Sequence, residues 1–152
     1  MARQPEASVH LVEIPAARFP ILVPSATVAE VVTYTEPAPL PLAPHWVLGV
    51  FGWRTKAIAV VSFDTLLTGI AATPGPRSKI VVFYPLPGTG EADFFGVLSS
   101  KEPFPRVVDE SSGLAPSSTG EVESAYVAAT VRLRERTLLI PSFDALKEAF
   151  YP

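Results

Sequence analysis

The amino-acid sequence predicts an all-β fold with little helix. Seventeen prolines and nine glycines are spread among short apolar runs, which is typical of many short strands joined by turns. Hydrophobic residues make up 48% of the 152 residues and charged residues 18%, so the chain carries enough apolar material to bury a core. Two segments of the chain also match each other. We therefore expect one domain over residues 1–152, built from two related, closely packed halves.

The expected strands follow one another along the whole chain. Residues 25–32 can form either a helical turn or a strand, because Ser25 is a suitable N-cap while the β-branched residues favour a strand. A helix of any length is expected only at 143–151. The predicted strands are 9–14, 19–24, 46–53, 57–61, 79–84, 93–98, 122–133 and 137–140. The predicted loops are 35–45, 72–78, 85–92 and 110–120.

The internal match joins residues 46–66 to residues 126–146, which lie 80 positions further along the chain. The tripeptide Ser-Phe-Asp recurs within it, at 62–64 and at 142–144. Each copy is expected to form a strand, a tight turn, a strand and a short helical turn. Two copies are too few for a solenoid, so we expect a pseudo-symmetric pair of small barrels. The approximate halves are 15–70 and 78–150.

The repeated tripeptide has a structural and a catalytic interpretation. In the first, serine caps a helical turn, aspartate sits in the first turn of the helix, and phenylalanine fills the core. In the second, Ser62 or Ser142 acts as a nucleophile. The two histidines, His10 and His45, lie in a strand and in a Pro-rich loop, and no Ser/His/Asp grouping can be built around them. We therefore favour the structural interpretation.

Charge and composition argue against several functional classes. The net charge is −3, whereas a nucleic-acid-binding protein usually carries a basic surplus. The chain has no cysteine and shows no metal-ligand spacing or phosphate-binding loop. It lacks a signal peptide, and no apolar run approaches the roughly 18 residues that cross a bilayer. We expect a cytoplasmic protein that is not an enzyme, with no cofactor, no metal, no nucleic-acid partner and no membrane insertion.

The first copy of the repeat is apolar on both faces of its first strand, whereas the second copy has one polar face. Trp46, Leu48 and Val50 form the additional apolar face. This face needs cover, because an antiparallel strand with one wet face alternates apolar and polar residues. It belongs either to the seam between the halves or to a docking surface.

Arginines mark two further positions of interest. Arg132, Arg134 and Arg136 have the spacing of one strand face, which suggests either a solvated edge or an anion site. Arg54 follows Trp53 at the expected tip of a hairpin. An exposed Trp-Arg pair is typical of interface hot spots.

Three stretches of the chain resemble the CheW-like domain family. They are Val-Ala-Glu-Val at 28–31, LAPHWVLGV at 42–50, and Arg54 with the following Ile-Ala-Val at 58–60. The family typically shows V-x-E-V, a Pro-rich loop and W-[VI]-x-G-[VI]-x-N-L-R-G. The match is strong over 19–67 and weaker toward the C-terminus. It implies two five-stranded SH3-like β-barrels packed around a shared apolar seam.

The resemblance also implies a function and contact residues. The family consists of adaptors that tie chemoreceptors to a CheA-type histidine kinase, which implies a methyl-accepting chemoreceptor or similar sensor and that kinase as partners. The W-x-x-G…R segment lies at kinase and receptor contacts in the family, and the V-x-E-V segment lies near the receptor side. The implied partner-binding residues, with the neighbouring tryptophan added, are Val28, Glu30, Val31, Gly49, Trp53 and Arg54.

The departures from the family pattern point to a particular branch. Gly52, Trp53 and Thr55 stand where the family has Asn, Leu and Gly, while Ala59 replaces Pro and Ser62 replaces Asp. A Trp-Arg pair followed by S-F-[DE] resembles ChpC, an accessory CheW-like protein of chemosensory systems that control type IV pili. A rival hypothesis from another class is a small β-barrel that binds a ligand or peptide in the seam between its halves.

Overall fold

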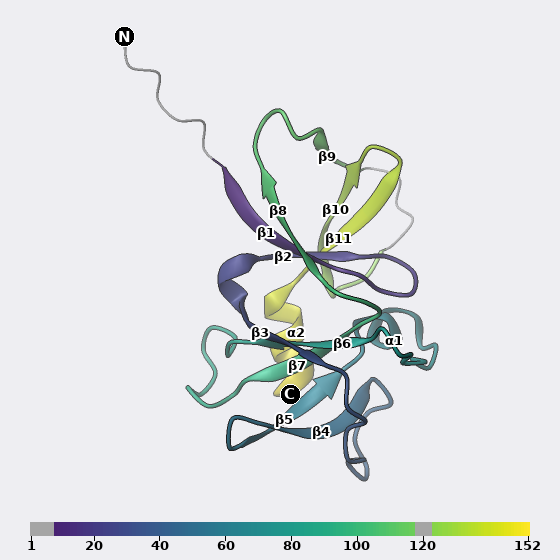
Figure 1. Ribbon diagram of the computed structural model, residues 1–152, viewed down its shortest axis with the longest axis vertical. Helices are drawn as coiled ribbons and strands as arrows, with labels where there is room; N and C mark the ends of the chain where they lie inside the picture. Colours follow the sequence, from purple (N-terminus) through teal and green to yellow (C-terminus); the bar gives the residue numbers. More distant parts are fainter. Residues whose placement is uncertain (1–7, 118–122) are drawn as a thin grey trace.

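The computed structural model describes residues 8–117 and 123–152 (Figure 1). The first residue of the predicted strand 122–133, part of the predicted loop 110–120 and the N-terminus lie outside the described residues. The strands are β1 Val9–Ile14, β2 Ile21–Pro24, β3 Val28–Thr33, β4 Val47–Trp53, β5 Lys56–Val61, β6 Lys79–Phe83, β7 Phe95–Ser99, β8 Phe104–Val108, β9 Leu114–Pro116, β10 Val127–Leu133 and β11 Arg136–Pro141. The helices are the 3-10 turn η1 Ser25–Thr27, α1 Phe63–Thr68 and α2 Phe143–Phe150.

The strands form two sheets, which lie one above the other in Figure 1. Sheet A has the order β8-β1-β2-β11-β10-β9, and sheet B has the order β3-β6-β7-β5-β4. The prediction of an all-β fold with a short C-terminal helix is confirmed. The halves expected at 15–70 and 78–150 do not correspond to the two sheets. Because β2 of the first half joins sheet A while β6 and β7 of the second half join sheet B, each expected half contributes strands to both sheets.

The repeated segments fold into the same unit. β4, β5 and α1 correspond to β10, β11 and α2, and each hairpin has a bulge near its start, at Val47/Gly49 and at Val127/Ala129. The correspondence extends further, since β5 pairs in parallel with β7 and β11 pairs in parallel with β2. The strands equivalent to β6 and β7 are therefore β1 and β2, from the start of the chain. Apart from the additional edge strand β9 of sheet A, the two sheets have the same spatial order of strands and are circular permutations of each other.

The buried apolar side chains of the described residues form three clusters. One cluster, the seam, lies between the sheets and draws residues from both. Each sheet also curls around an interior cluster of its own, so that sheet A and sheet B form the walls of barrel A and barrel B. The most buried residues of the seam include Ile14, Ile21, Val23, Val81, Phe83 and Leu139.

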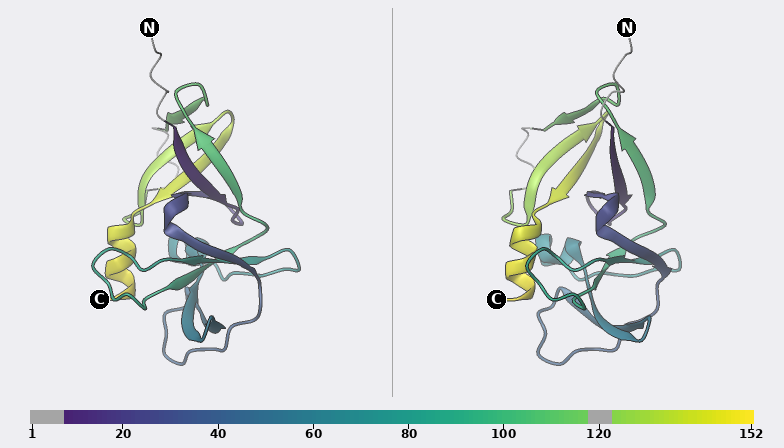
Figure 2. Two further views of the ribbon diagram at one scale, coloured as in Figure 1. Left: turned by 60° about the vertical axis from the view of Figure 1, so that its left-hand side comes forward. Right: turned by 90° about the vertical axis from the view of Figure 1, so that its left-hand side faces the viewer.

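The apolar face of Trp46, Leu48 and Val50 is covered within the chain. Trp46 packs on the seam, where its ring centroid lies 5.6 Å from that of Phe150, at the end of the helix that runs alongside sheet B in Figure 2. Leu48 packs in the interior of barrel B, because the bulge at the start of β4 interrupts the alternation of side chains. Val50 is half-buried and exchanges two backbone hydrogen bonds of 2.8 Å with Ala38 in the Pro-rich loop. This face belongs to the core and its cover.

Both Ser-Phe-Asp tripeptides begin helices, which confirms their structural interpretation. The Oγ atoms of Ser62 and Ser142 each accept a hydrogen bond of 3.2 Å from the backbone N–H three residues later. Each aspartate lies in the first turn of its helix. Phe63 is buried in the seam, whereas Phe143 is only partly buried at its edge.

Several local expectations differ from the structure. The ambiguous segment 25–32 is divided between η1 and β3. β8 and β9 were not predicted, since β8 contains Pro105 and a proline is tolerated only on an edge strand such as this one. Arg132, Arg134 and Arg136 do not share one strand face. They belong to β10, to the hairpin tip and to β11 respectively, because the chain reverses between them.

Phe63→Ala is expected to lower the free energy of unfolding by about 3–5 kcal/mol, the usual cost of truncating a buried phenylalanine. Phe143→Ala should cost distinctly less, because that ring is only partly buried. Ser142→Ala, which removes a cap, should cost about 0.5–2 kcal/mol. Urea unfolding of the three variants gives the comparison. Equal losses at both phenylalanines would contradict the difference in packing between the two copies of the repeat.

Candidate interaction site at a hairpin tip

The hairpin between β4 and β5 turns through Arg54 and Thr55, both with positive φ angles of 44° and 65°. Two positive φ values at a two-residue tip are the geometry of a type I′ turn, which favours Asn and Gly. Thr55 stands where the family pattern has glycine, and a β-branched residue at positive φ is strained. Such strain persists only where the surrounding structure imposes it. The neighbours of the tip supply that constraint.

Trp53 is buried, with 6% of its surface exposed. The expectation of an exposed Trp-Arg pair is therefore wrong for the tryptophan. Its ring packs in the interior of barrel B, and its Nε1 donates a 2.7 Å hydrogen bond to Oε2 of Glu30. Glu30 lies on β3 and Trp53 on β4, at the two ends of sheet B. This bond therefore links the first and last strands of the sheet and closes barrel B.

Arg54 contacts both residues that close barrel B, and its side chain remains accessible to solvent. Its guanidinium lies 4.7 Å from the centroid of the Trp53 ring, and its Nη2 lies 3.3 Å from Oε2 of Glu30. The Arg54 side chain is nevertheless 65% exposed, against 39% for Glu30. The structure thus brings together three of the six residues expected to bind partners, and it presents the cation in a defined orientation.

The other three expected residues have supporting positions. Val28 and Val31 lie on β3 and are half-buried against the seam. Gly49 is buried with a φ of 146°, and a Cβ atom there would overlap the backbone of Ala38 and the Pro37 ring. Glycine at this position is therefore required for the Pro-rich loop to pack on β4. None of the three belongs to the Glu30–Trp53–Arg54 cluster.

Two aromatic residues extend the cluster, and sequence reasoning missed them. The Phe94 ring lies 5.0 Å from that of Trp53, and the Tyr84 ring lies 5.7 Å from that of Phe94. Tyr84 is 50% exposed, and Lys56 Nζ lies 5.8 Å from the Phe94 centroid. Pairing the predicted strands 79–84 and 93–98 as a hairpin would have placed the two rings together. We call the surface formed by Glu30, Arg54, Lys56, Tyr84 and Phe94 the tip surface.

The tip surface has the chemistry of a protein contact. It combines aromatic area with cations held over rings, a composition enriched at interface hot spots. It contains no histidine and no nucleophile paired with a base. Within residues 8–117 and 123–152, no group of three or more His, Cys, Asp or Glu residues could hold a metal ion. In the same ranges, no helix is long and apolar enough to cross a bilayer.

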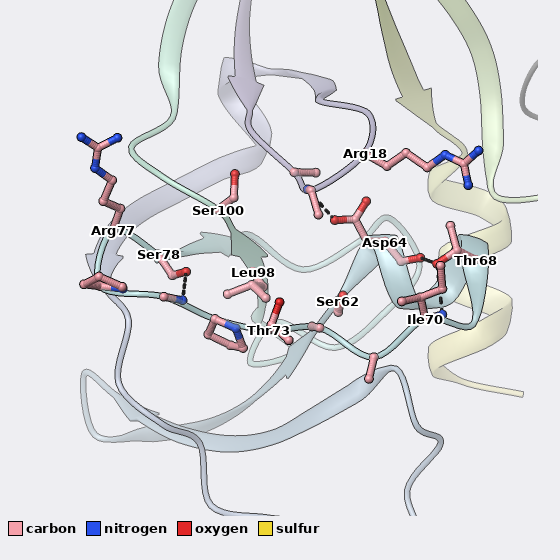
Figure 3. A pocket seen from close by; sticks show the side chains of 17 residues that line it. Arg18, Ser62, Asp64, Thr68, Ile70, Thr73, Arg77, Ser78, Leu98 and Ser100 are labelled. Carbon is pink, nitrogen blue, oxygen red and sulfur yellow. Dashed lines mark hydrogen bonds between the residues drawn. The ribbon is translucent and has the colours of Figure 1, made fainter.

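A cleft of about 530 Å³ opens between the β1–β2 loop, α1 and the segment 70–78 (Figure 3). Most residues that line it are exposed, so it is an open surface feature rather than an enclosed apolar pocket. Its best-placed polar groups are already engaged. Asp64 accepts a 2.8 Å hydrogen bond from the Ala17 N–H, and Ser62 caps α1. Arg18 and Arg77 lie at opposite ends of the cleft. The rival hypothesis of a ligand enclosed in the seam gains no support from this geometry.

Comparison with known proteins agrees with this fold. The sequence profile of the CheW-like domain matches residues 9–149. The chain belongs to the CheW-like domain family. A solved structure titled scaffolding protein TtCheW, from Thermoanaerobacter tengcongensis, superposes on it with a TM-score of 0.71 and 18% identity, over 93% of this chain and 89% of that chain. Likeness at this identity supports the CheW fold alone. Comparison with individually curated sequences gave no match.

In this CheW-like chain, alanine substitutions of Trp53 and Arg54 should lower the free energy of unfolding by clearly different amounts. Trp53→Ala is expected to cost about 3–5 kcal/mol, because it empties the interior of barrel B and removes the bond to Glu30. Arg54→Ala should cost less than about 1 kcal/mol, since its ion pair is largely exposed. Denaturant unfolding followed by tryptophan fluorescence suits the arginine variant, and circular dichroism suits both. A Trp53→Ala protein as stable as the parent would show that the ring is not a core residue.

Proposed function

We propose that this protein is a non-enzymatic cytoplasmic adaptor that couples a chemoreceptor or similar sensor to a CheA-type histidine kinase. Membership of the CheW-like family supports the class of function. The single observation that supports the contact is Arg54, which is exposed to solvent yet fixed by the Trp53 ring and the Glu30 carboxylate. A side chain already held in position loses less conformational entropy on binding.

The proposed mechanism is positioning rather than chemistry. An adaptor that binds two partners converts their encounter into an effectively intramolecular event, which raises their effective concentration. We assign the kinase contact to the tip surface. The half-buried β3 residues Val28 and Val31, beside Glu30, contribute to the sensor side in this proposal. Gly49 acts indirectly, by letting the Pro-rich loop pack against β4.

Arg54→Ala is expected to weaken binding to the cognate kinase fragment by more than about 1 kcal/mol, as truncation of a hot-spot arginine does. Isothermal titration calorimetry with the full chain measures the change. Arg132→Ala is the matched control, because Arg132 is also an exposed arginine but lies on sheet A. An affinity unchanged by Arg54→Ala, or reduced equally by both variants, would remove the tip surface from the proposal.

We further propose that the partners belong to a chemosensory system that controls type IV pili. The support is the Trp-Arg pair at the tip, together with Ser-Phe-Asp after β5. An exposed Trp53 would add bulk at the kinase contact. Trp53 is buried, so it does not do so. Instead it gives the Arg54 guanidinium an aromatic face in place of the aliphatic face that leucine would offer.

This pilus assignment predicts a choice between kinases. The protein should bind a pilus-type CheA homologue in preference to a flagellar-type CheA in a competition pull-down. Trp53→Leu combined with Thr55→Gly, which restores two family residues at the tip, should narrow that preference, because specificity depends on differences between competing contacts. Equal binding of both kinases by the unchanged protein would refute the pilus assignment while leaving the adaptor function intact.

A further inference from the structure

Barrel A contains a buried carboxylate paired with two partly exposed arginines, a cluster that the adaptor proposal does not use. Glu13 of β1 is 1% exposed, and both of its carboxylate oxygens accept hydrogen bonds from arginines. Arg106 donates through Nε to Oε1 at 2.6 Å, and Arg136 donates through Nη2 to Oε2 at 2.6 Å. The hydrogen bond to Glu13 raises the pKa of Arg136 above its ordinary value. Both guanidinium groups are therefore locked in place by a carboxylate that water does not reach.

The internal repeat identifies what this cluster replaces. Glu30 pairs with Val82 in sheet B, while Phe104 pairs with Glu13 in sheet A. In the permuted arrangement, β1 takes the place of β6 and β8 takes the place of β3. Glu13 therefore occupies the position of the apolar Val82, and Phe104 occupies the position of Glu30. The carboxylate that closes barrel B has no counterpart in the equivalent place of barrel A.

This exchange leaves one arginine without a partner. Arg134 lies at the tip of the β10–β11 hairpin with a φ of 59°, at the position that Arg54 occupies in the other hairpin. Arg54 pairs with Glu30, but in barrel A the register position of Glu30 is taken by Phe104, which carries no charge. Among residues 8–117 and 123–152, Arg134 has no ion pair and no side-chain hydrogen bond. Its charge is available to an external group.

The three arginines line one cavity. It is an open surface cavity of about 510 Å³ that lies between β8, the loop that follows it and the β10–β11 hairpin. Glu13 neutralises one of the three positive charges, which leaves a net charge of about two in the cavity wall. Among the described residues, no carboxylate lines the cavity, and the Asp109 carboxylate in the adjacent loop accepts hydrogen bonds from the hydroxyls of Ser111 and Ser112. Within 8–117 and 123–152 Arg106 donates only through its Nε, which leaves both of its terminal nitrogens able to donate to another group.

We propose that this cavity binds an acidic side chain from a protein partner. In the sister barrel the equivalent hairpin arginine, Arg54, pairs with a carboxylate, that of Glu30, so a carboxylate is a suitable partner for the arginine at this turn. Guanidinium groups that are oriented beforehand match a carboxylate with paired hydrogen bonds. The rim is apolar, with Val107 56% exposed and with Val108 and Leu133 beside it, which suits the methylene groups of a glutamate in a peptide. This inference does not rest on the adaptor function or on the tip surface.

The experiment titrates the full chain with a short capped oligo-glutamate peptide at fixed ionic strength, followed by backbone NMR. The expected result is shifts confined to 105–108, 112 and 133–136, with an apparent affinity that Arg134→Gln lowers about tenfold, the loss expected when a charge-assisted hydrogen bond is removed. Arg134 does not contact Glu13, so this variant should keep the parent's urea midpoint. Arg132→Gln removes the same charge from β10 outside the cavity and should bind like the parent.

Three outcomes would overturn the proposal. The first is an equal loss of peptide affinity in Arg134→Gln and Arg132→Gln, which would indicate nonspecific electrostatic attraction. The second is an oligo-glutamine peptide that binds as well as oligo-glutamate. The third is inorganic phosphate that produces the same shifts and displaces the peptide at the same concentration, since the cavity would then be a general anion site rather than a site for an acidic side chain.

Discussion

Burial on both faces of each sheet is the constraint on which the rest of this structure depends. One face of each sheet packs in the common seam, and the other must be covered by the curl of the sheet itself. Neither sheet could bury its seam face alone, so we expect the two barrels to fold as one unit rather than as independent domains. Helix α2 and the Pro-rich loop complete the cover, the first through Phe150 on Trp46 and the second through Ala38 on Val50.

The same constraint produces the tip surface. Barrel B is closed by the bond between Trp53 and Glu30, and the group that closes it also fixes Arg54 outside. At this tip the residues that pack the core therefore also set the orientation of the exposed arginine. Barrel A instead holds a buried carboxylate on β1 between an arginine of β8 and an arginine of β11, an arrangement that seldom adds net stability over an apolar one. Its retention of polar groups at that position is consistent with a role for the guanidinium groups beyond packing.

Much of the local structure could be predicted from the sequence, because the repeat and the caps are encoded locally. The offset between the two Ser-Phe-Asp tripeptides located both hairpins and both helices. The permutation was not predictable, since which strands pair with β11 depends on contacts between distant segments. Trp53 was expected outside because a Trp-Arg pair resembles a hot spot, whereas burial depends on the curl of the sheet. Phe94 reaches the tip surface because of the register between β6 and β7, which the alternation of apolar and polar residues alone does not specify.

The permutation has a consequence for how the chain acquires its structure during synthesis. All strands of sheet B come from one continuous segment, 28–99, so this sheet can assemble while the rest of the chain is still being translated. The pair β1–β2 precedes this segment but finds its parallel neighbour β11 only after all the strands from β3 to β10 have been made. At about 5–20 residues per second, those apolar strands wait for several seconds. Strands β1 and β2 are thus made before sheet B, yet the sheet they belong to is completed after it, and the edge of β2 that awaits β11 is exposed in the meantime.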